Sequence, residues 1–192
     1  MTRLATLLLA ATLAACAGPA RERVDSLLQV GAGETVVVGR IELVPQLRKE
    51  EQRIDAVNSG SFENIVFLIA DQSNRVLKGE PNTADFDGRI EATLEKTFFV
   101  RSSDKPFYIL GGMLWLEIGK GSNRAYFPGG LRVPLKPGDK AVYIGTVRYH
   151  RDEFWNFTKA AIVDDYDRTS AEFRKKFGAK TPLRKALLTP AK

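Results

Sequence analysis

Short apolar runs separated by turn residues recur from residue 34 to residue 163 and limit the possible folds more than any other feature. In the stretch 89–100, apolar and polar side chains alternate, which is the period-two pattern of a half-buried strand. The run Ile65–Ile69 is apolar on both faces and indicates a central strand. About seven to nine short strands with frequent turns predict a mainly β fold, an antiparallel β-sandwich with one C-terminal helix.

The predicted helix occupies about residues 167–177, where the strand pattern stops. Thr169 and Glu172 have the spacing of a capping box, and Gly178 suits the position just after a helix. Pro182 then prevents the helix from continuing. The tail that follows is basic up to Lys192. Such a tail is either simply solvated or lies on anionic head groups or an acidic partner.

The first fifteen residues have the pattern of an export signal. Arg3 provides a positive charge, and Leu4–Leu13 consists almost wholly of Leu, Ala and Thr. This apolar run is too short to span a bilayer, because a spanning helix needs about twenty residues. Small residues then lead into Cys16, which is the only cysteine of the chain. We therefore expect residues 1–15 to be a signal peptide.

The sequence Leu13-Ala14-Ala15-Cys16 resembles the lipobox of bacterial lipoproteins. The resemblance implies that Cys16 is diacylated with palmitate-type chains, that the leader is removed before it, and that the acyl chains hold the protein on a lipid bilayer. Ala17 follows, where an Asp commonly retains such proteins in the inner membrane. The resemblance thus implies a lipid anchor in the cell outer membrane, facing the periplasm or the cell surface. The alternative is an ordinary cleaved signal peptide with a coincidental cysteine.

The remaining chain divides into two parts. Residues 16–33 contain Gly18-Pro19, Gly31-Ala32-Gly33 and mixed charges, and they predict a lipidated tether, with a short amphipathic turn at 24–28 that docks on the domain. Residues 34–192 predict the β-sandwich domain with its helix and basic tail. With Cys16 modified, no thiol is left for a disulfide, a metal site or nucleophilic catalysis. The domain is long enough to bury a core without such staples.

A second resemblance rests on short structural motifs. A turn, Lys136-Pro137-Gly138-Asp139, precedes Tyr143-Ile144-Gly145-Thr146, and Ile162-Val163-Asp164-Asp165 then leads into the helix. Together with Val38-Gly39-Arg40-Ile41, this order resembles a loose group of bacterial lipoproteins built on transthyretin-like or carboxypeptidase-regulatory-like domains. The resemblance implies an Ig/transthyretin-like sandwich in an exported protein. The group shares no active site, so the resemblance assigns no catalytic residue.

The charge balance narrows the classes of partner. The chain has 29 Lys and Arg against 23 Asp and Glu, for a formal net charge of +6, and the cations are spread along it. Nucleic-acid binding is disfavoured, because an export signal is present and no helix-turn-helix or RNA-binding aromatic motif accompanies the charge. We expect the partners to be the lipid bilayer, through acylated Cys16, and a protein or polymer of the envelope.

Three residues are the candidates for a binding surface. The second half of the chain is rich in aromatic residues, and Tyr126 and Trp155 are the two that we expect to be exposed. Exposed aromatic side chains stack on sugars or receive a partner peptide. His150, the only histidine, lies at a predicted strand end near carboxylates, where it is a loop residue, a general base or a metal ligand.

The densest group of acids is Asp164, Asp165 and Asp167. Carboxylate oxygens suit calcium, which makes this group a weak calcium candidate, although the spacing is not that of an EF-hand. Capping of the following helix explains the same residues more simply. We therefore predict no cofactor and no catalytic residue.

Three functions remain open from the sequence. The leading hypothesis is a non-enzymatic envelope lipoprotein that binds a protein or an envelope polymer through a strand edge or the aromatic face. A hydrolase of the envelope would instead need a pocket with converging acids and a shifted pKa. A carrier of lipids or other small ligands would need an apolar cavity inside the sandwich.

Overall fold

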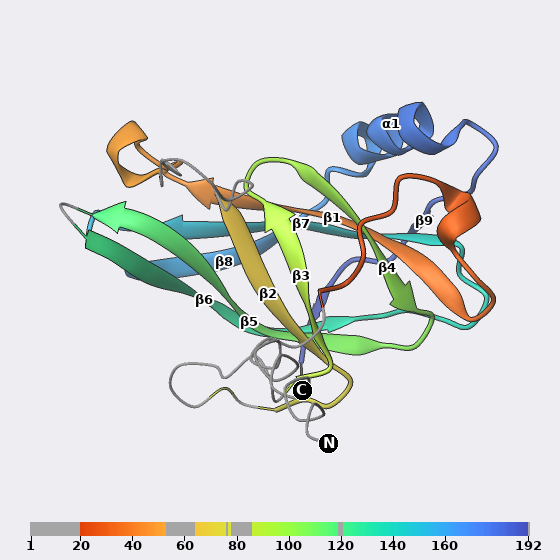
Figure 1. Ribbon diagram of the computed structural model, residues 1–192, viewed down its shortest axis with the longest axis horizontal. Helices are drawn as coiled ribbons and strands as arrows, with labels where there is room; N and C mark the ends of the chain where they lie inside the picture. The colour runs from red at the N-terminus through yellow and green to blue at the C-terminus, as the bar shows by residue number, and fades with distance from the viewer. Residues whose placement is uncertain (1–19, 53–63, 76, 78–85, 119–120, 192) are drawn as a thin grey trace, which may run out of the picture.

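The computed structural model describes residues 20–52, 64–75, 77, 86–118 and 121–191 (Figure 1). Runs rich in Val, Ile and Phe form the strands, as β propensity predicts. The strands are β1 (Glu34–Val44), β2 (Ile65–Asp71), β3 (Gly88–Thr93), β4 (Thr97–Ser103), β5 (Phe107–Ile118), β6 (Gly121–Val133), β7 (Ala141–Arg151), β8 (Phe157–Val163), β9 (Arg184–Lys185) and β10 (Thr189–Pro190). One α-helix, α1 (Tyr166–Phe177), and two 3-10 turns, η1 (Leu27–Gln29) and η2 (Lys49–Glu51), complete the described elements.

The strands form two sheets. Sheet I has the order β4-β1-β7-β8, and β9 pairs with β7 beside β8. Sheet II has the order β10-β6-β5-β2-β3. All pairs are antiparallel except β1 with β7 and β7 with β9, which are parallel. The expectation of a mainly β sandwich with one C-terminal helix is confirmed.

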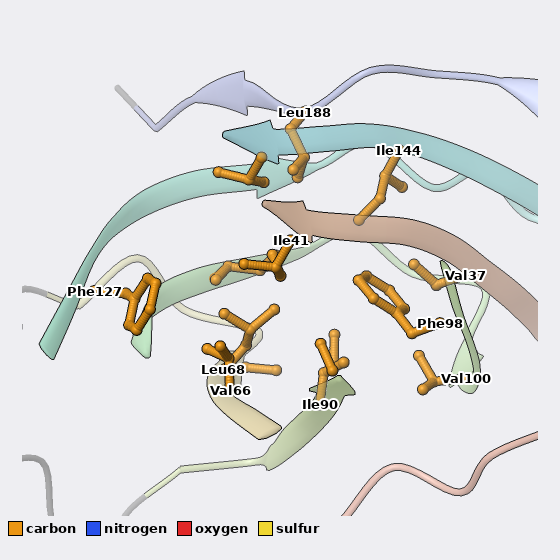
Figure 2. Close-up of a cluster of buried hydrophobic side chains, with 14 of the residues drawn as sticks. Val37, Ile41, Val66, Leu68, Ile90, Phe98, Val100, Phe127, Ile144 and Leu188 are labelled. Atoms are coloured by element: carbon orange, nitrogen blue, oxygen red, sulfur yellow. The ribbon is translucent and has the colours of Figure 1, made fainter. Parts of the chain in front are cut away.

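The hydrophobic core lies between the two sheets. Figure 2 shows side chains from both layers meeting there, among them Ile41 and Ile144 from sheet I and Leu68 and Ile90 from sheet II. A second, smaller core lies on the outer face of sheet I, where α1 covers β1 and β7 (Figure 1). Its buried members are Val24, Val36, Val38, Ala141 and Phe173. Alternate residues of β1 therefore serve two different cores.

The stretch 89–100, which the alternation predicts as one strand, is in fact two. Strands β3 and β4 belong to different sheets and are separated by a turn at residues 94–96. Glu95 has a φ of 62°, its N–H donates to the carbonyl oxygen of Ile41, and its carboxylate accepts from the N–H of Leu43 at 3.0 Å. The apolar alternation continues on either side of this turn, which explains why periodicity does not reveal it.

Helix α1 begins at Tyr166, and the capping box predicted at Thr169 is wrong. The N-cap is Asp165, which makes no side-chain cap, and Thr169 is buried inside the helix. Tertiary contacts fix the start instead, because the N–H of Asp165 donates to the hydroxyl of Tyr143 at 2.7 Å. The predicted end is confirmed: Gly178 has a φ of 90°, and its N–H donates to the Arg174 carbonyl oxygen.

Both ends of the described chain join the two sheets. Near the N-terminus, the N–H of Arg21 donates to the carbonyl oxygen of Arg89 on β3, at the edge of sheet II. The N–H of Val24 donates to the carbonyl oxygen of Phe99 on β4, at the edge of sheet I. At the C-terminus, β9 pairs with β7 and β10 pairs with β6. The N-terminal segment therefore covers one flank of the sandwich, and the two short C-terminal strands cover part of the other.

The expected tether docks in part: within the predicted turn at 24–28, Val24 is buried and Leu27 packs against the smaller core, whereas Leu28 is exposed. Cys16 and the leader lie outside the described residues, so the structure does not test the predicted lipidation. Within the part of the chain that the structure describes, no helix is sufficiently long and apolar to span a bilayer.

Candidate functional site

Strand β8 forms one edge of sheet I and is bare on its outer side. It pairs with β7 on one side, from Thr146 opposite Val163 to Arg151 opposite Phe157, and no described residue pairs with its other side. Thr158, Lys159 and Ala160 are exposed. An unpaired edge offers a row of N–H and C=O groups to another strand. We use the term open flank for β8, the 152–156 loop and the adjacent groove beside β6.

The carboxylate of Asp152 holds the 152–156 loop together through hydrogen bonds. Asp152 accepts hydrogen bonds at 2.9 Å from the N–H groups of Phe154 and Asn156 and from the Asn156 side chain. The Asn156 side chain and these backbone donors lower the pKa of Asp152. Because each of these donors lies within the loop, Asp152 organises the hairpin.

The exposed aromatic residue of this loop is Phe154, whereas the sequence predicts its neighbour Trp155. Trp155 has a φ of 66°, which interrupts the alternation of side chains and turns its ring inward. The guanidinium carbon of Arg151 lies 3.9 Å from the centre of that ring, a cation–π contact. Phe154 is exposed instead, with 76% of its surface accessible. Sequence reasoning missed Phe154 because an ordinary strand alternation gives no sign of a positive φ.

A buried ion pair holds the base of this hairpin. Glu51 and Arg151 are both almost fully buried, and their side chains meet at 2.6 Å and 3.0 Å. Arg151 also donates to the carbonyl oxygens of Pro45 and Gln46. Burial opposes the ionisation of Glu51, but hydrogen bonds from Arg151 and Arg48 outweigh it and lower the Glu51 pKa to about 2. The pair is therefore ionised and fully engaged in structure.

Tyr126 lines the groove that forms part of the open flank. Its side chain is 39% accessible on the outer face of sheet II, since its neighbours Ala125 and Phe127 face the core. The groove encloses about 540 Å³, and its lining includes Tyr126, Pro128, Arg75 and Phe157. Tyr126 is therefore exposed as expected and contributes an aromatic wall to a surface groove.

Aromatic contacts close the sandwich below this groove. The ring centres of Phe127 and Phe157 are 4.7 Å apart, and those of Phe127 and Tyr149 are 5.0 Å apart. The Tyr149 hydroxyl donates to the Pro128 carbonyl oxygen at 2.8 Å, and burial raises the pKa of Tyr149. Strand β6 is thereby held against β8 through side chains, with the outer edge of β8 left free.

His150 lies on a different face from Tyr126 and Trp155. It is on the outer face of sheet I, opposite Val44 on β1 and Lys159 on β8. Among the described residues, no hydrogen bond or ion pair involves its imidazole; its carbonyl oxygen accepts from Thr158. Arg148, next along this face, is paired with Glu42 at 2.8 Å. The three predicted surface residues thus lie on neighbouring elements but do not converge on one point.

The acidic cluster is used by the helix start. Asp164 forms an ion pair with Lys185 at 2.8 Å and accepts from the N–H of Tyr166, and the hydrogen bond from Lys185 lowers the Asp164 pKa. Asp165 is the N-cap, and Asp167 lies in the first turn, where a negative charge is favourable. In the described part of the chain, no group of three or more His, Cys, Asp or Glu is placed to hold a metal ion. The calcium hypothesis for Asp164, Asp165 and Asp167 gains no support.

Comparison with known proteins finds no matching family model, no similar curated protein and no similar solved structure.

Proposed function

We propose that this protein is a lipid-anchored module of the bacterial cell envelope that binds a protein or an envelope polymer without catalysing a reaction. The lipobox-like sequence ending at Cys16 supports the location. The bare edge of β8, with exposed Phe154 at the adjacent loop, carries the binding function. An unpaired strand edge is a ready template for pairing with another chain.

The docked N-terminal segment bears on the geometry of the anchor. Ala20 already bridges to Arg89 at the edge of sheet II. Four residue steps separate it from Cys16, and they span at most about 14 Å when fully extended. A lipidated Cys16 would therefore hold the sandwich close to the bilayer surface, with the tether too short for the domain to range freely.

The ionisation of the acids argues against a hydrolase. A general acid at neutral pH needs a raised pKa, whereas every described carboxyl group with a shifted pKa has it lowered. These groups are Asp25, Glu51, Asp71, Asp139, Asp152 and Asp164. Each accepts hydrogen bonds from a cation or from backbone and amide groups beside it.

The packing argues against a carrier of apolar ligands. The space between the sheets is occupied by side chains from both layers (Figure 2). The groove at Tyr126 lies on the surface, and the ring of Phe127 beneath it belongs to the core. A ligand of the size that carriers enclose would have to displace core side chains, at a cost of several kcal/mol.

Metabolic labelling with an alkyne-tagged palmitate analogue tests the anchor. We expect the wild-type protein to be labelled and to stay with the membrane fraction, and the Cys16→Ser variant to be unlabelled and released. A wild-type protein that is processed but carries no label would overturn the lipid anchor and leave an ordinary export signal.

Site-specific photo-crosslinking in the envelope tests the binding function. A photoreactive amino acid at Phe154 is compared with one at Lys175, an exposed position on α1. We expect a discrete adduct from position 154 and none from position 175. Equal adducts from both positions, or none from either, would contradict a binding surface at the open flank.

A further inference from the structure

The four sheet edges differ in how they are covered. The edge at β3 is bridged by Ala20, and the edge at β4 by Arg23. The edge at β6 is covered in part by β10 at Leu131 and Arg132. No described segment pairs with the outer edge of β8. Within the described residues, the N-terminal segment and β10 therefore cover the other edges, and this one is unpaired.

Strand β8 also has little of the usual protection against pairing. Natural edge strands carry several charges, a proline or a bulge that turns them away. The sequence of β8, Phe157-Thr158-Lys159-Ala160-Ala161-Ile162-Val163, contains one charge and no proline. Its one register shift lies at the start of the strand, between His150 and Arg151 of β7. Beyond Thr158 the register is regular, so five consecutive residues present an ordinary strand edge.

The two faces of β8 have different chemistry. Ile162 and Phe157 lie toward the core, where both pack against it. Lys159 lies on the outer face, opposite His150, and forms no ion pair among the described residues. A strand added along 159–163 would place alternate side chains beside Ile162 on the inner face and beside Lys159, Ala161 and Val163 on the outer face. An acidic residue would complement Lys159.

We infer that β8 receives an extended segment of a partner protein as an added strand, and that this segment alternates apolar and acidic side chains. The inference rests on the proposed binding function and names its partner chemistry. Main-chain hydrogen bonds along β8 supply the contact common to all such partners, and the Lys159 side chain selects the acidic ones. Phe154, exposed at the adjoining loop, extends the contact beyond the strand.

A second copy of this chain fits the edge less well. Antiparallel pairing of the regular stretch 159–163 with its own copy about a two-fold axis centres on Ala161 and sets each Lys159 opposite Val163 of the copy. Neither lysine then gains an opposite charge across the strands. The charge of the edge therefore favours a different, acidic segment as the occupant.

The test titrates the full-length protein in detergent micelles with a capped hexapeptide of alternating valine and glutamate. Amide hydrogen exchange reports which backbone groups become protected. We expect slower exchange for alternate amides of β8, and no such protection from a peptide of alternating valine and lysine. The Lys159→Glu variant should bind the acidic peptide roughly fivefold more weakly, because an opposite-charge pair becomes a like-charge pair. The Lys175→Glu variant should bind it as the wild type does.

Three results would overturn the inference. They are protection that appears elsewhere and spares β8, a peptide preference that Lys159→Glu leaves unchanged, and a dimer that protects β8 without any peptide. Palmitate labelling of the same preparations distinguishes failure of strand addition at β8 from failure of the lipid anchor. A labelled protein without protection at β8 overturns strand addition alone, whereas protection in an unlabelled protein overturns the anchor alone.

Discussion

The two flanks of the sandwich differ in how their sheet edges are covered. At the β3–β4 flank, a segment that precedes the first strand lies across both sheet edges and donates or accepts main-chain hydrogen bonds, as at Arg21 and Val24. At the β6–β8 flank, the C-terminal β9 and β10 cover only part of the opening, and no described strand pairs with the outer edge of β8. One flank is closed by backbone, the other largely by side chains.

The difference shows what each flank is free to do. The β3–β4 flank has no unpaired row of N–H and C=O groups to offer where the segment crosses it. The β6–β8 flank is held by the rings of Phe127, Tyr149 and Phe157 and by the ion pair of Glu51 with Arg151. Because these contacts do not use the outer edge of β8, they hold the two sheets together at this flank and leave that edge available for pairing.

Truncation of Phe173, which packs α1 and the N-terminal segment onto sheet I, should have the largest effect on stability. Phe173 is fully buried and packs with Val24 on the outer face of sheet I. We expect Phe173→Ala to lower the free energy of unfolding by about 3–5 kcal/mol, since a large core side chain is lost and a cavity remains. Urea denaturation measures the change, with exposed Lys175→Ala as the control. A loss below about 1 kcal/mol would mean that α1 and the N-terminal segment do not form a shared core.

Breaking the ion pair at the open flank should cost about 3 kcal/mol. Glu51→Gln leaves the buried Arg151 charge without its counter-charge, and exchange should rise across the 152–156 loop. The pKa of Glu51 is lowered from 4.5 to about 2, so the ionised form stabilises the fold above pH 4.5. This stabilisation is lost as the pH falls from 4.5 toward 2. The gap between wild type and variant should therefore narrow over that range in urea denaturation, and a constant gap would refute the assignment.

A smaller truncation isolates the docking of the N-terminal segment. Val24→Ala removes about two buried methyl groups and should cost about 1.5 kcal/mol. Exchange of the Arg101 amide, which donates to the Glu22 carbonyl oxygen, should rise. The β8 amides, on the opposite flank, should be unaffected. Faster exchange on both flanks would show that the two are coupled rather than independent.

Periodicity predicted the layers of this fold but not its corners. The Val- and Ile-rich runs and the turn at 136–139 locate β1, β2 and β7 correctly, because strand burial follows a period of two. The same periodicity does not predict two non-glycine residues that have a positive φ. Glu95 divides the stretch 89–100 between two sheets, and Trp155 exchanges its exposure with Phe154. Such conformations are imposed by tertiary contacts, so no local pattern announces them.

The candidate site was only partly visible for a related reason. Tyr126, one of the two aromatic residues expected to be exposed, is exposed because it alternates along β6 with buried Ala125 and Phe127. The partnership of Glu51 with Arg151 joins residues one hundred positions apart, and the bare edge of β8 depends on the strand order of sheet I. Strand order is set by pairing across the whole chain, and β8, with one charge and no proline, carries few of the residues that mark an edge strand in a sequence.

Phe154→Ala should have the smallest effect on stability and a clear effect on binding. The side chain is 76% exposed, and the loop is organised by Asp152 and by the main chain of residue 154, which the substitution retains. We expect the free energy of unfolding to change by less than about 0.5 kcal/mol. Binding of the valine–glutamate hexapeptide should weaken only slightly, because that peptide is matched to β8. A longer segment that also reaches the loop should lose more, since an exposed aromatic ring is a typical anchor at interfaces. Titrations with hexapeptide and decapeptide therefore separate the strand edge from the aromatic contact, and equal losses for both would place Phe154 in the strand-binding site itself.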